Sequence, residues 1–234
     1  MKKLLTLLFL AYSGLAIGQL NLSKSEKYCF LVGTLSDYSG HRQTFTATTD
    51  SNYFQLVDMY SGEQEAIVSI IDSLFRDEHK DMRIVTDSNR HQKSLHSKSL
   101  SAVIDDYYNY KSSGWTIVGD TLYSGFLKPD RFSTEMEKLC FLAGAYLRDG
   151  GKTDANEYYF HMFNSISKAK LCVNLLNELK CSNVKLFTKN RIPVGNWISF
   201  VPSENVMEAI KEVERVTTKK PLSSDMLKRI LESE

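Results

Sequence analysis

The sequence predicts an α+β fold in which an α-β-β-α-β-β-α unit occurs twice and the two units pack through their first helices. Three observations predict it: two equally placed helix starts, glycines at equivalent positions, and the same order of expected elements in both halves. The helix starts are Ser23-Lys-Ser-Glu26 and Thr134-Glu-Met-Glu137. Each is a capping box, in which the cap and the glutamate satisfy each other's backbone N–H groups. Their separation is 134 − 23 = 111 residues.

The segments that follow the two capping boxes match at this same offset. Seven positions between residues 23 and 40 are identical to their counterparts: Glu26/Glu137, Lys27/Lys138, Cys29/Cys140, Phe30/Phe141, Leu31/Leu142, Gly33/Gly144 and Gly40/Gly151. Two unrelated amphipathic helices would share apolar spacing, but they would not share caps, glycines and element order. We therefore interpret the chain as an internal duplication.

Hydrophobic periodicity and turn residues predict the elements of the first repeat, residues 23–112, in order. The first helix begins at Ser23 and ends at Ser39-Gly40. The remaining expected elements are strands at 42–48, 53–60 and 82–86, a polar hairpin at 89–98, and helices at 63–76 and 101–110.

A connector at 113–130, with short strands at 115–118 and 121–126, leads to the second repeat at 131–216. This repeat begins with a helix at Thr134, whose apolar stripe runs to Leu147. Its other expected elements are strands at 158–163, 184–188 and 197–201 and helices at 165–180 and 203–214. A tail at 217–234 contains a short helix at 224–231.

The first eighteen residues form a hydrophobic leader. Two lysines precede an apolar run and small residues, which is the layout of a secretory signal peptide, and a read-through extension is the alternative. A working signal peptide would make the protein secreted or periplasmic. Its removal would change the formal net charge from +1 to 27 − 28 = −1, so binding to nucleic acid must depend on local patches.

The four cysteines are Cys29, Cys140, Cys172 and Cys181. An even number in an exported chain allows two disulfides in three pairings. Three of the four lie among apolar residues of expected helices, where a free cysteine behaves as a small hydrophobe. No pair has CxxC spacing, so the sequence does not indicate a structural metal site.

Gly33 and Gly144 each stand beside a small residue, Val32 and Ala143. These positions predict a close approach of the two first helices, with both helices ending at the same place. Acidic residues at those ends would then lie side by side, and paired carboxylates are hard-oxygen ligands for Mg²⁺.

Residues 142–150 resemble the signature nonapeptide of the LAGLIDADG homing endonucleases, with matches at Leu142, Ala143, Gly144, Asp149 and Gly150. Together with the repeat, the resemblance covers about residues 23–216 and implies a single-chain, two-repeat member. It implies signature helices at the interface, terminal acids that bind divalent metal, and saddle-shaped antiparallel sheets over the DNA major groove. It further implies a monomer with pseudo-two-fold symmetry and an intracellular, site-specific endonuclease that hydrolyses double-stranded DNA with Mg²⁺ and takes no small-molecule substrate.

The resemblance places Asp149 at the metal-binding position, and the equivalent residue of the first copy is Tyr38, with Asp37 one residue earlier. A shift of one residue turns a side chain by about 100° around a helix. We predict Asp149 and Asp37 as the catalytic metal ligands. The alternatives are an inactive DNA-binding protein of the same fold and, if the leader is a signal peptide, an exported non-enzymatic binding protein.

Two basic runs without an acid, 88–98 and 180–191, follow the central helix of each repeat. Cationic side chains there could contact phosphates with a steep salt dependence. The predicted DNA-binding residues are Arg90, Lys93, Lys98, Lys185, Lys189 and Arg191, and a solvated hairpin is the simpler alternative.

Overall fold

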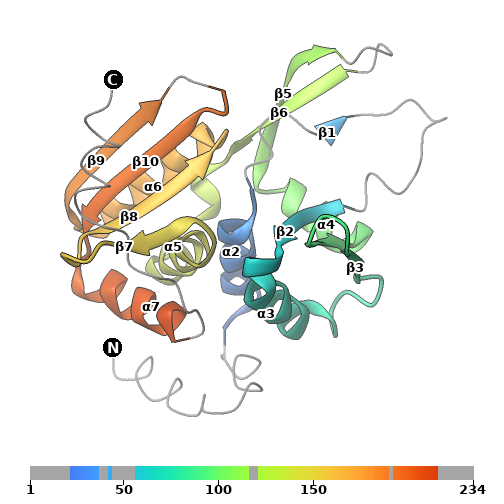
Figure 1. The fold of residues 1–234 in the computed structure, drawn as a ribbon, viewed down its shortest axis with the longest axis horizontal. Helices are drawn as coiled ribbons and strands as arrows, with labels where there is room; N and C mark the ends of the chain where they lie inside the picture. The colour runs from blue at the N-terminus through green and yellow to red at the C-terminus, as the bar shows by residue number, and fades with distance from the viewer. Residues whose placement is uncertain (1–21, 37–41, 44–55, 116–120, 190–191, 216–234) are drawn as a thin grey trace.

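In a computed structural model, two helices lie side by side between the two halves of the protein: α2 (Lys24–Thr34) and α5 (Glu135–Asp149) (Figure 1). The structure describes residues 22–36, 42–43, 56–115, 121–189 and 192–215. Both capping boxes are formed, with Ser23 and Thr134 as N-caps. The predicted packing of the two halves through their first helices is therefore confirmed.

The first half contains helix α3 (Glu65–Phe75) and two small antiparallel sheets, of which the β2-β4-β3 sheet packs against α3. One sheet has the order β2-β4-β3, formed by β2 (Leu56–Ser61), β4 (Gln92–His96) and β3 (Arg83–Asp87). The other has the order β1-β6-β5, formed by β1 (Arg42–Gln43), β6 (Thr121–Leu127) and β5 (Tyr108–Trp115). A short helix, α4 (Lys98–Asp105), joins the two sheets, and 3₁₀ turns at Gly62–Gln64 and Pro129–Arg131 complete the half.

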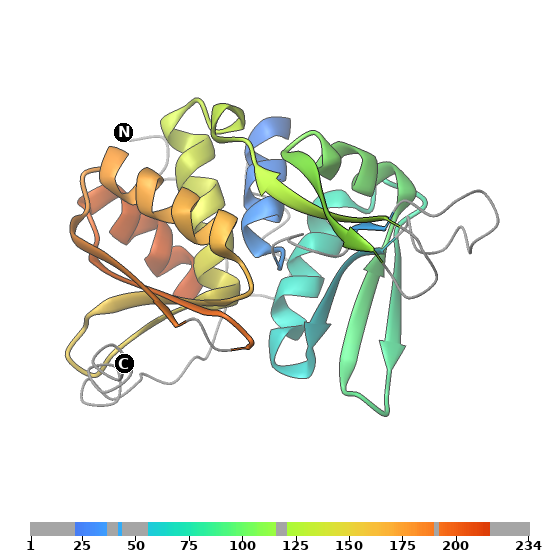
Figure 2. The ribbon, with the colours of Figure 1, turned by 90° about the horizontal axis from the view of Figure 1, so that it is seen from above.

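The second half is one antiparallel sheet covered on one face by helices (Figure 2). Its strand order is β7-β8-β10-β9, formed by β7 (Gly150–Lys152), β8 (Tyr158–Phe163), β10 (Gly195–Val201) and β9 (Ser182–Lys189). The covering helices are α5, α6 (Ile166–Glu178) and α7 (Glu204–Glu214). Tyr158, Phe160 and Met162 alternate along β8 and are buried beneath these helices, as the period of two along a strand requires.

Two expected helix ends are wrong. The helix expected at 101–110 ends at Asp105, because Tyr108 starts β5, whose pairing with Leu127 buries both side chains. Tertiary pairing overrides local helix propensity there. Helix α2 ends at Thr34 rather than at Ser39-Gly40, and Leu35 is already extended, with φ −77° and ψ 147°.

Strand β7 was not expected, because two of its three residues are glycines and glycine disfavours strands. It forms because Gly151 pairs with Tyr159, whose ring covers the glycine. The strand predicted at 42–48 is described only at Arg42 and Gln43, and the leader and the helix expected at 224–231 lie outside the described residues.

One hydrophobic core runs through both halves and includes α2 and α5. The four cysteines are buried, and none of them forms a disulfide with another. Among the helices that the structure describes, none has the length and apolar character needed to span a bilayer.

Candidate functional site

The crossing of α2 and α5 depends on one glycine from each helix. A Cβ on Gly33 would lie 2.1 Å from the backbone oxygen of Phe141, and a Cβ on Gly144 would lie 2.1 Å from the backbone oxygen of Phe30. Phe30 and Phe141 are themselves a matching pair at the offset of 111. The contacts are therefore reciprocal, as a pseudo-two-fold axis through the crossing requires. Ala143, beside Gly144, is half-buried against the same core.

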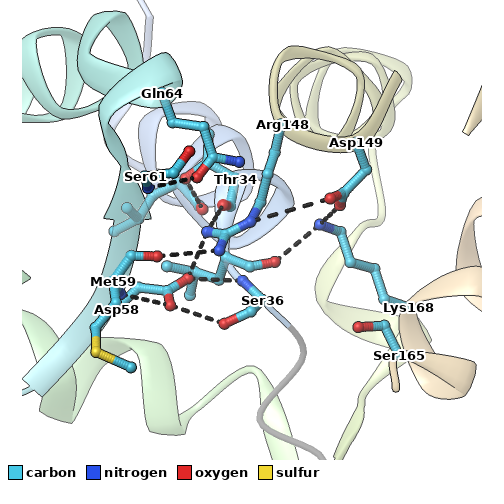
Figure 3. Close-up of polar contacts among 12 residues, drawn as sticks. Thr34, Ser36, Asp58, Met59, Ser61, Gln64, Arg148, Asp149, Ser165 and Lys168 are labelled. Carbon is cyan, nitrogen blue, oxygen red and sulfur yellow. Dashed lines mark hydrogen bonds and ion pairs between the residues drawn. The ribbon is translucent and has the colours of Figure 1, made fainter. Parts of the chain in front are cut away.

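The crossing brings the C-terminal ends of the two helices together, and Arg148 of α5 reaches into the first half there (Figure 3). Its guanidinium donates to the backbone oxygen of Thr34 at 2.8 Å, to Asp58 Oδ2 at 2.7 Å and to the backbone oxygen of Met59 at 3.1 Å. Its guanidinium carbon lies 4.9 Å from the centroid of the Tyr60 ring. Burial lowers the pKa of Arg148, but neighbouring Asp58 and other groups raise it on balance, so the residue stays charged.

Asp58 of β2 is buried, and both of its carboxylate oxygens accept hydrogen bonds from protein groups. Besides Arg148, its carboxylate accepts from the Ser36 backbone N–H at 2.6 Å, from the Ser36 hydroxyl at 2.7 Å and from the Met59 N–H at 2.7 Å. This network fixes the chain just after α2 to strand β2.

Asp149, the last residue of α5, is held by a lysine. The ammonium group of Lys168, from the first turn of α6, donates to Asp149 Oδ2 at 2.7 Å and to the backbone oxygen of Leu35 at 2.8 Å (Figure 3). The Lys168 side chain is only 1% exposed. Arg148 Nε lies 4.0 Å from the other Asp149 oxygen. One ammonium therefore joins the helix-end carboxylate of the second half to the helix-end carbonyl of the first.

The outer face of the second sheet, opposite the helices, is aromatic and basic. Strand register places Tyr159, His161 and Phe163 of β8 on this face with Trp197 of β10. His161 stacks on Trp197 with centroids 3.8 Å apart. Burial lowers the pKa of His161, although the charge of Asp149 opposes the shift. Lys185 and Lys189 of β9 lie opposite Ser199 and Gly195, on the same face.

The architecture matches known structures. I-DmoI in complex with DNA and Ca superposes with a TM-score of 0.53 and 16% identity, over 87% of this chain and 96% of that chain. Mesophilic variants of the homing endonuclease I-DmoI match with a TM-score of 0.53 and 16% identity, over 84% and 97%. An I-DmoI variant in complex with its target DNA in the presence of 2 mM Mg matches with a TM-score of 0.50 and 17% identity, over 84% and 98%.

The chain has the two-repeat LAGLIDADG fold. At 16 and 17% identity the likeness concerns the fold alone. No protein-family model matches the chain, and no curated protein matches it either.

The two signature helices of this LAGLIDADG fold differ in length. Helix α5 continues to Asp149, whose counterpart at the offset of 111 is residue 38, but α2 ends four positions earlier, at Thr34. Asp37 and Tyr38 lie outside the described residues, so the prediction of Asp37 as a ligand stays a prediction. From the sequence we treated Asp37 as rotated by about 100° around a continuous helix. That rotation does not apply, because α2 ends at Thr34.

The described oxygens at this site do not fit a divalent metal as the structure holds them. Asp149 is bound by Lys168, and Asp58 accepts four hydrogen bonds from protein groups. Two cations already balance these two carboxylates. Within the described ranges, no group of three or more His, Cys, Asp or Glu could hold a metal ion.

The DNA-binding residues predicted in the first half lie on different elements, and their contact with DNA stays a prediction. Arg90 is exposed in the β3–β4 turn, 3.7 Å from Asp87. Lys93 forms an ion pair with Glu65 at the start of α3, on the helix side of its sheet. Lys98 is the exposed first residue of α4, and Arg191 of the second half lies outside the described residues.

Sequence reasoning missed Arg148, Asp58 and Lys168 as a connected group. A signal for Lys168 was present: it precedes Leu171, Cys172 and Leu175 by three, four and seven residues, on the buried face of α6. A lysine on an apolar stripe needs a buried partner. The partner of Arg148 is 90 residues away in sequence, so no local pattern could identify it.

Proposed function

We propose that the protein binds double-stranded DNA as a monomer, along the outer faces of its strands. The observation that supports this most directly is the likeness to I-DmoI, which was crystallised with DNA, over 87% of this chain. The reciprocal glycine crossing gives the chain the same two-repeat frame. In Figure 2, strands β3 and β4 and the second sheet lie on the side of the molecule where α2 and α5 have their C-terminal ends. Strands of both halves are therefore on the same side of the molecule.

The charge distribution of the second half agrees with this proposal. Lys185 is exposed on the outer face of β9, and Lys189 lies four residues further along that face. Successive cations along a strand suit a phosphate backbone, which supplies most of the affinity of such complexes. The formal net charge of +1 means that the affinity must come from such local groups.

Gel-shift titrations against a random duplex pool, followed by selection and sequencing of the bound fraction, test the proposal. We expect binding that weakens steeply with salt. The double variant Lys185→Ala/Lys189→Ala should reduce the slope of log Kobs against log salt by about 2 if each lysine contacts one phosphate. Lys170→Ala, which removes an exposed lysine on helix α6, is the matched control and should leave the slope unchanged. Duplex binding that is absent, or insensitive to salt, would contradict the proposal.

The second candidate function is Mg²⁺-dependent cleavage of the bound DNA, which would require Lys168 to release the Asp149 carboxylate. One observation favours it: Asp149 lies at the end of its signature helix, beside the crossing. Incubation of the selected duplex with Mg²⁺ tests it directly. Cleavage that Asp149→Asn abolishes, while binding persists, would establish the nuclease; an intact duplex would favour binding alone.

An intracellular location accompanies this proposal, because a genomic DNA partner is not available outside the cell. Mass spectrometry of the mature N-terminus is the inexpensive test. A chain that starts near Gln19 and is found outside the cytoplasm would favour the exported binding protein instead.

A further inference from the structure

The contacts of Lys168 are of the kind that a bound cation makes. Its ammonium group joins one carboxylate oxygen and one backbone carbonyl oxygen, at 2.7 and 2.8 Å. Carboxylates and backbone carbonyls are also the hard oxygen ligands of divalent cations. The two oxygens come from the ends of the two signature helices, Asp149 from α5 and Leu35 from just beyond α2. Lys168 therefore lies where the two halves meet, and it belongs to neither signature helix.

Burial makes this contact strong. The Lys168 side chain is 1% exposed and that of Asp149 is 18% exposed. A buried ammonium is stable only when it is paired and hydrogen-bonded, since removing either partner leaves an uncompensated charge. A metal could reach Asp149 Oδ2 only if Lys168 left, and Lys168 would then lose its carboxylate partner.

Among the side chains of this site that the structure describes, the charges of Arg148, Lys168, Asp58 and Asp149 balance, so these groups leave no deficit for a metal to fill. Arg148 and Lys168 carry two positive charges, and Asp58 and Asp149 carry two negative charges, within one chain of contacts (Figure 3). A divalent ion added to this balanced group would stand beside two cations that cannot move into water without breaking buried bonds. Asp58 cannot turn toward the ion, because Ser36, Met59 and Arg148 hold both of its oxygens.

We propose that the Lys168 ammonium is a built-in replacement for the divalent cation at the crossing of the signature helices, so that this LAGLIDADG fold joins its two halves without metal. The inference concerns cation binding and not DNA binding. It is therefore tested without DNA, and its failure is distinct from failure of the proposed function.

The replacement of the divalent cation by Lys168 is tested by titrating the DNA-free protein with Mn²⁺. Electron paramagnetic resonance measures the ion that remains free. The wild type should bind no more Mn²⁺ than Asp149→Asn does. Lys168→Met keeps the length of the side chain and removes the charge, and it should gain about one Mn²⁺ per chain, since the freed carboxylate and carbonyl are hard oxygen ligands. The double variant Lys168→Met/Asp149→Asn should lose this ion again. A folded Lys168→Met that binds no Mn²⁺ would overturn the inference.

A second measurement does not need Lys168→Met, so it tests the replacement of the metal by Lys168 even if that variant fails to fold. A ligand that binds the native state raises the melting temperature as its concentration exceeds its Kd. We expect Mg²⁺ and Mn²⁺ to leave the melting temperature of the wild type unchanged, relative to the same ionic strength of NaCl. A rise specific to the divalent ions, absent in Asp149→Asn, would show that a metal displaces Lys168 and would refute the replacement.

Discussion

Replacing Gly33 by alanine changes the closest contact between the two halves. The new Cβ would stand 2.1 Å from the backbone oxygen of Phe141 and 2.9 Å from the backbone nitrogen of Ala145. Ordinary van der Waals contact begins near 3.4 Å, so the helices must separate by about 3.4 − 2.1 = 1.3 Å. Both obstructing atoms belong to a helix backbone and cannot rotate away as the end of a side chain could.

Two opposing effects set the magnitude. Alanine improves helix propensity over glycine by about 1 kcal/mol. Forced separation of a well-packed interface costs about 1–3 kcal/mol or more, and here it also loosens Leu31 and Leu142, which are buried at the crossing. With the upper value of about 3 kcal/mol, because the obstructing backbone atoms cannot rotate away, we expect a net loss of about 3 − 1 = 2 kcal/mol in the free energy of unfolding for Gly33→Ala, and a similar loss for Gly144→Ala. One displacement relieves both clashes, so the double variant should lose less than the sum of the two single variants.

Urea unfolding followed by circular dichroism measures these changes. Gly62→Ala is the matched control, because its Cβ would meet only the backbone oxygen of His91, at an ordinary 3.5 Å. That variant should stay within about 0.5 kcal/mol of the wild type. Gly33→Ala and Gly144→Ala variants as stable as the control, or strictly additive losses in the double variant, would refute the reciprocal crossing.

Three further predictions concern the buried polar groups. Arg148→Met should destabilise the fold by about 3–5 kcal/mol in chemical denaturation, because it leaves the Asp58 carboxylate buried without a cation; Arg215→Met, which removes a more exposed arginine paired with Glu212, is the control and should have little effect. Burial lowers the pKa of His79, His96 and His161, so the unfolded chain binds more protons below its histidine pKa of about 6.5. The free energy of unfolding should consequently fall as the pH decreases through about 6.5, and a flat profile between about pH 7.5 and 5.5 would contradict this assignment. Burial raises the pKa of Cys29 and Cys140 to about 12, so both thiols should resist alkylation in the native protein and react once it is unfolded, as mass spectrometry can record.

The elements with a local signature could be predicted from the sequence. The capping boxes, the apolar stripes and the paired glycines each involve residues within one helical turn or two, and the duplication showed every signal twice. This was enough for the fold class and for the packing through the first helices. Strand β5 was partly misread as helix, because its start is fixed by pairing with β6 and not by its own residues.

The chemistry of the helix ends could not be predicted in the same way. A repeat implies that both copies continue equally, yet α2 stops at Thr34, where Ser36 instead binds Asp58 of a different element. The contacts of Lys168 depend on how α6 lies against both signature helices, which is a property of the assembled fold. Asp149 was therefore identified as an important position, but the group that contacts it was not.

Anomalous diffraction from crystals grown with Mn²⁺ tests the central claim most directly. We expect the Lys168 ammonium beside Asp149, as in Figure 3, and within hydrogen-bonding distance of the Leu35 carbonyl oxygen, with no anomalous peak beside either oxygen. A manganese peak coordinated by Asp149, with Lys168 turned away, would contradict the account.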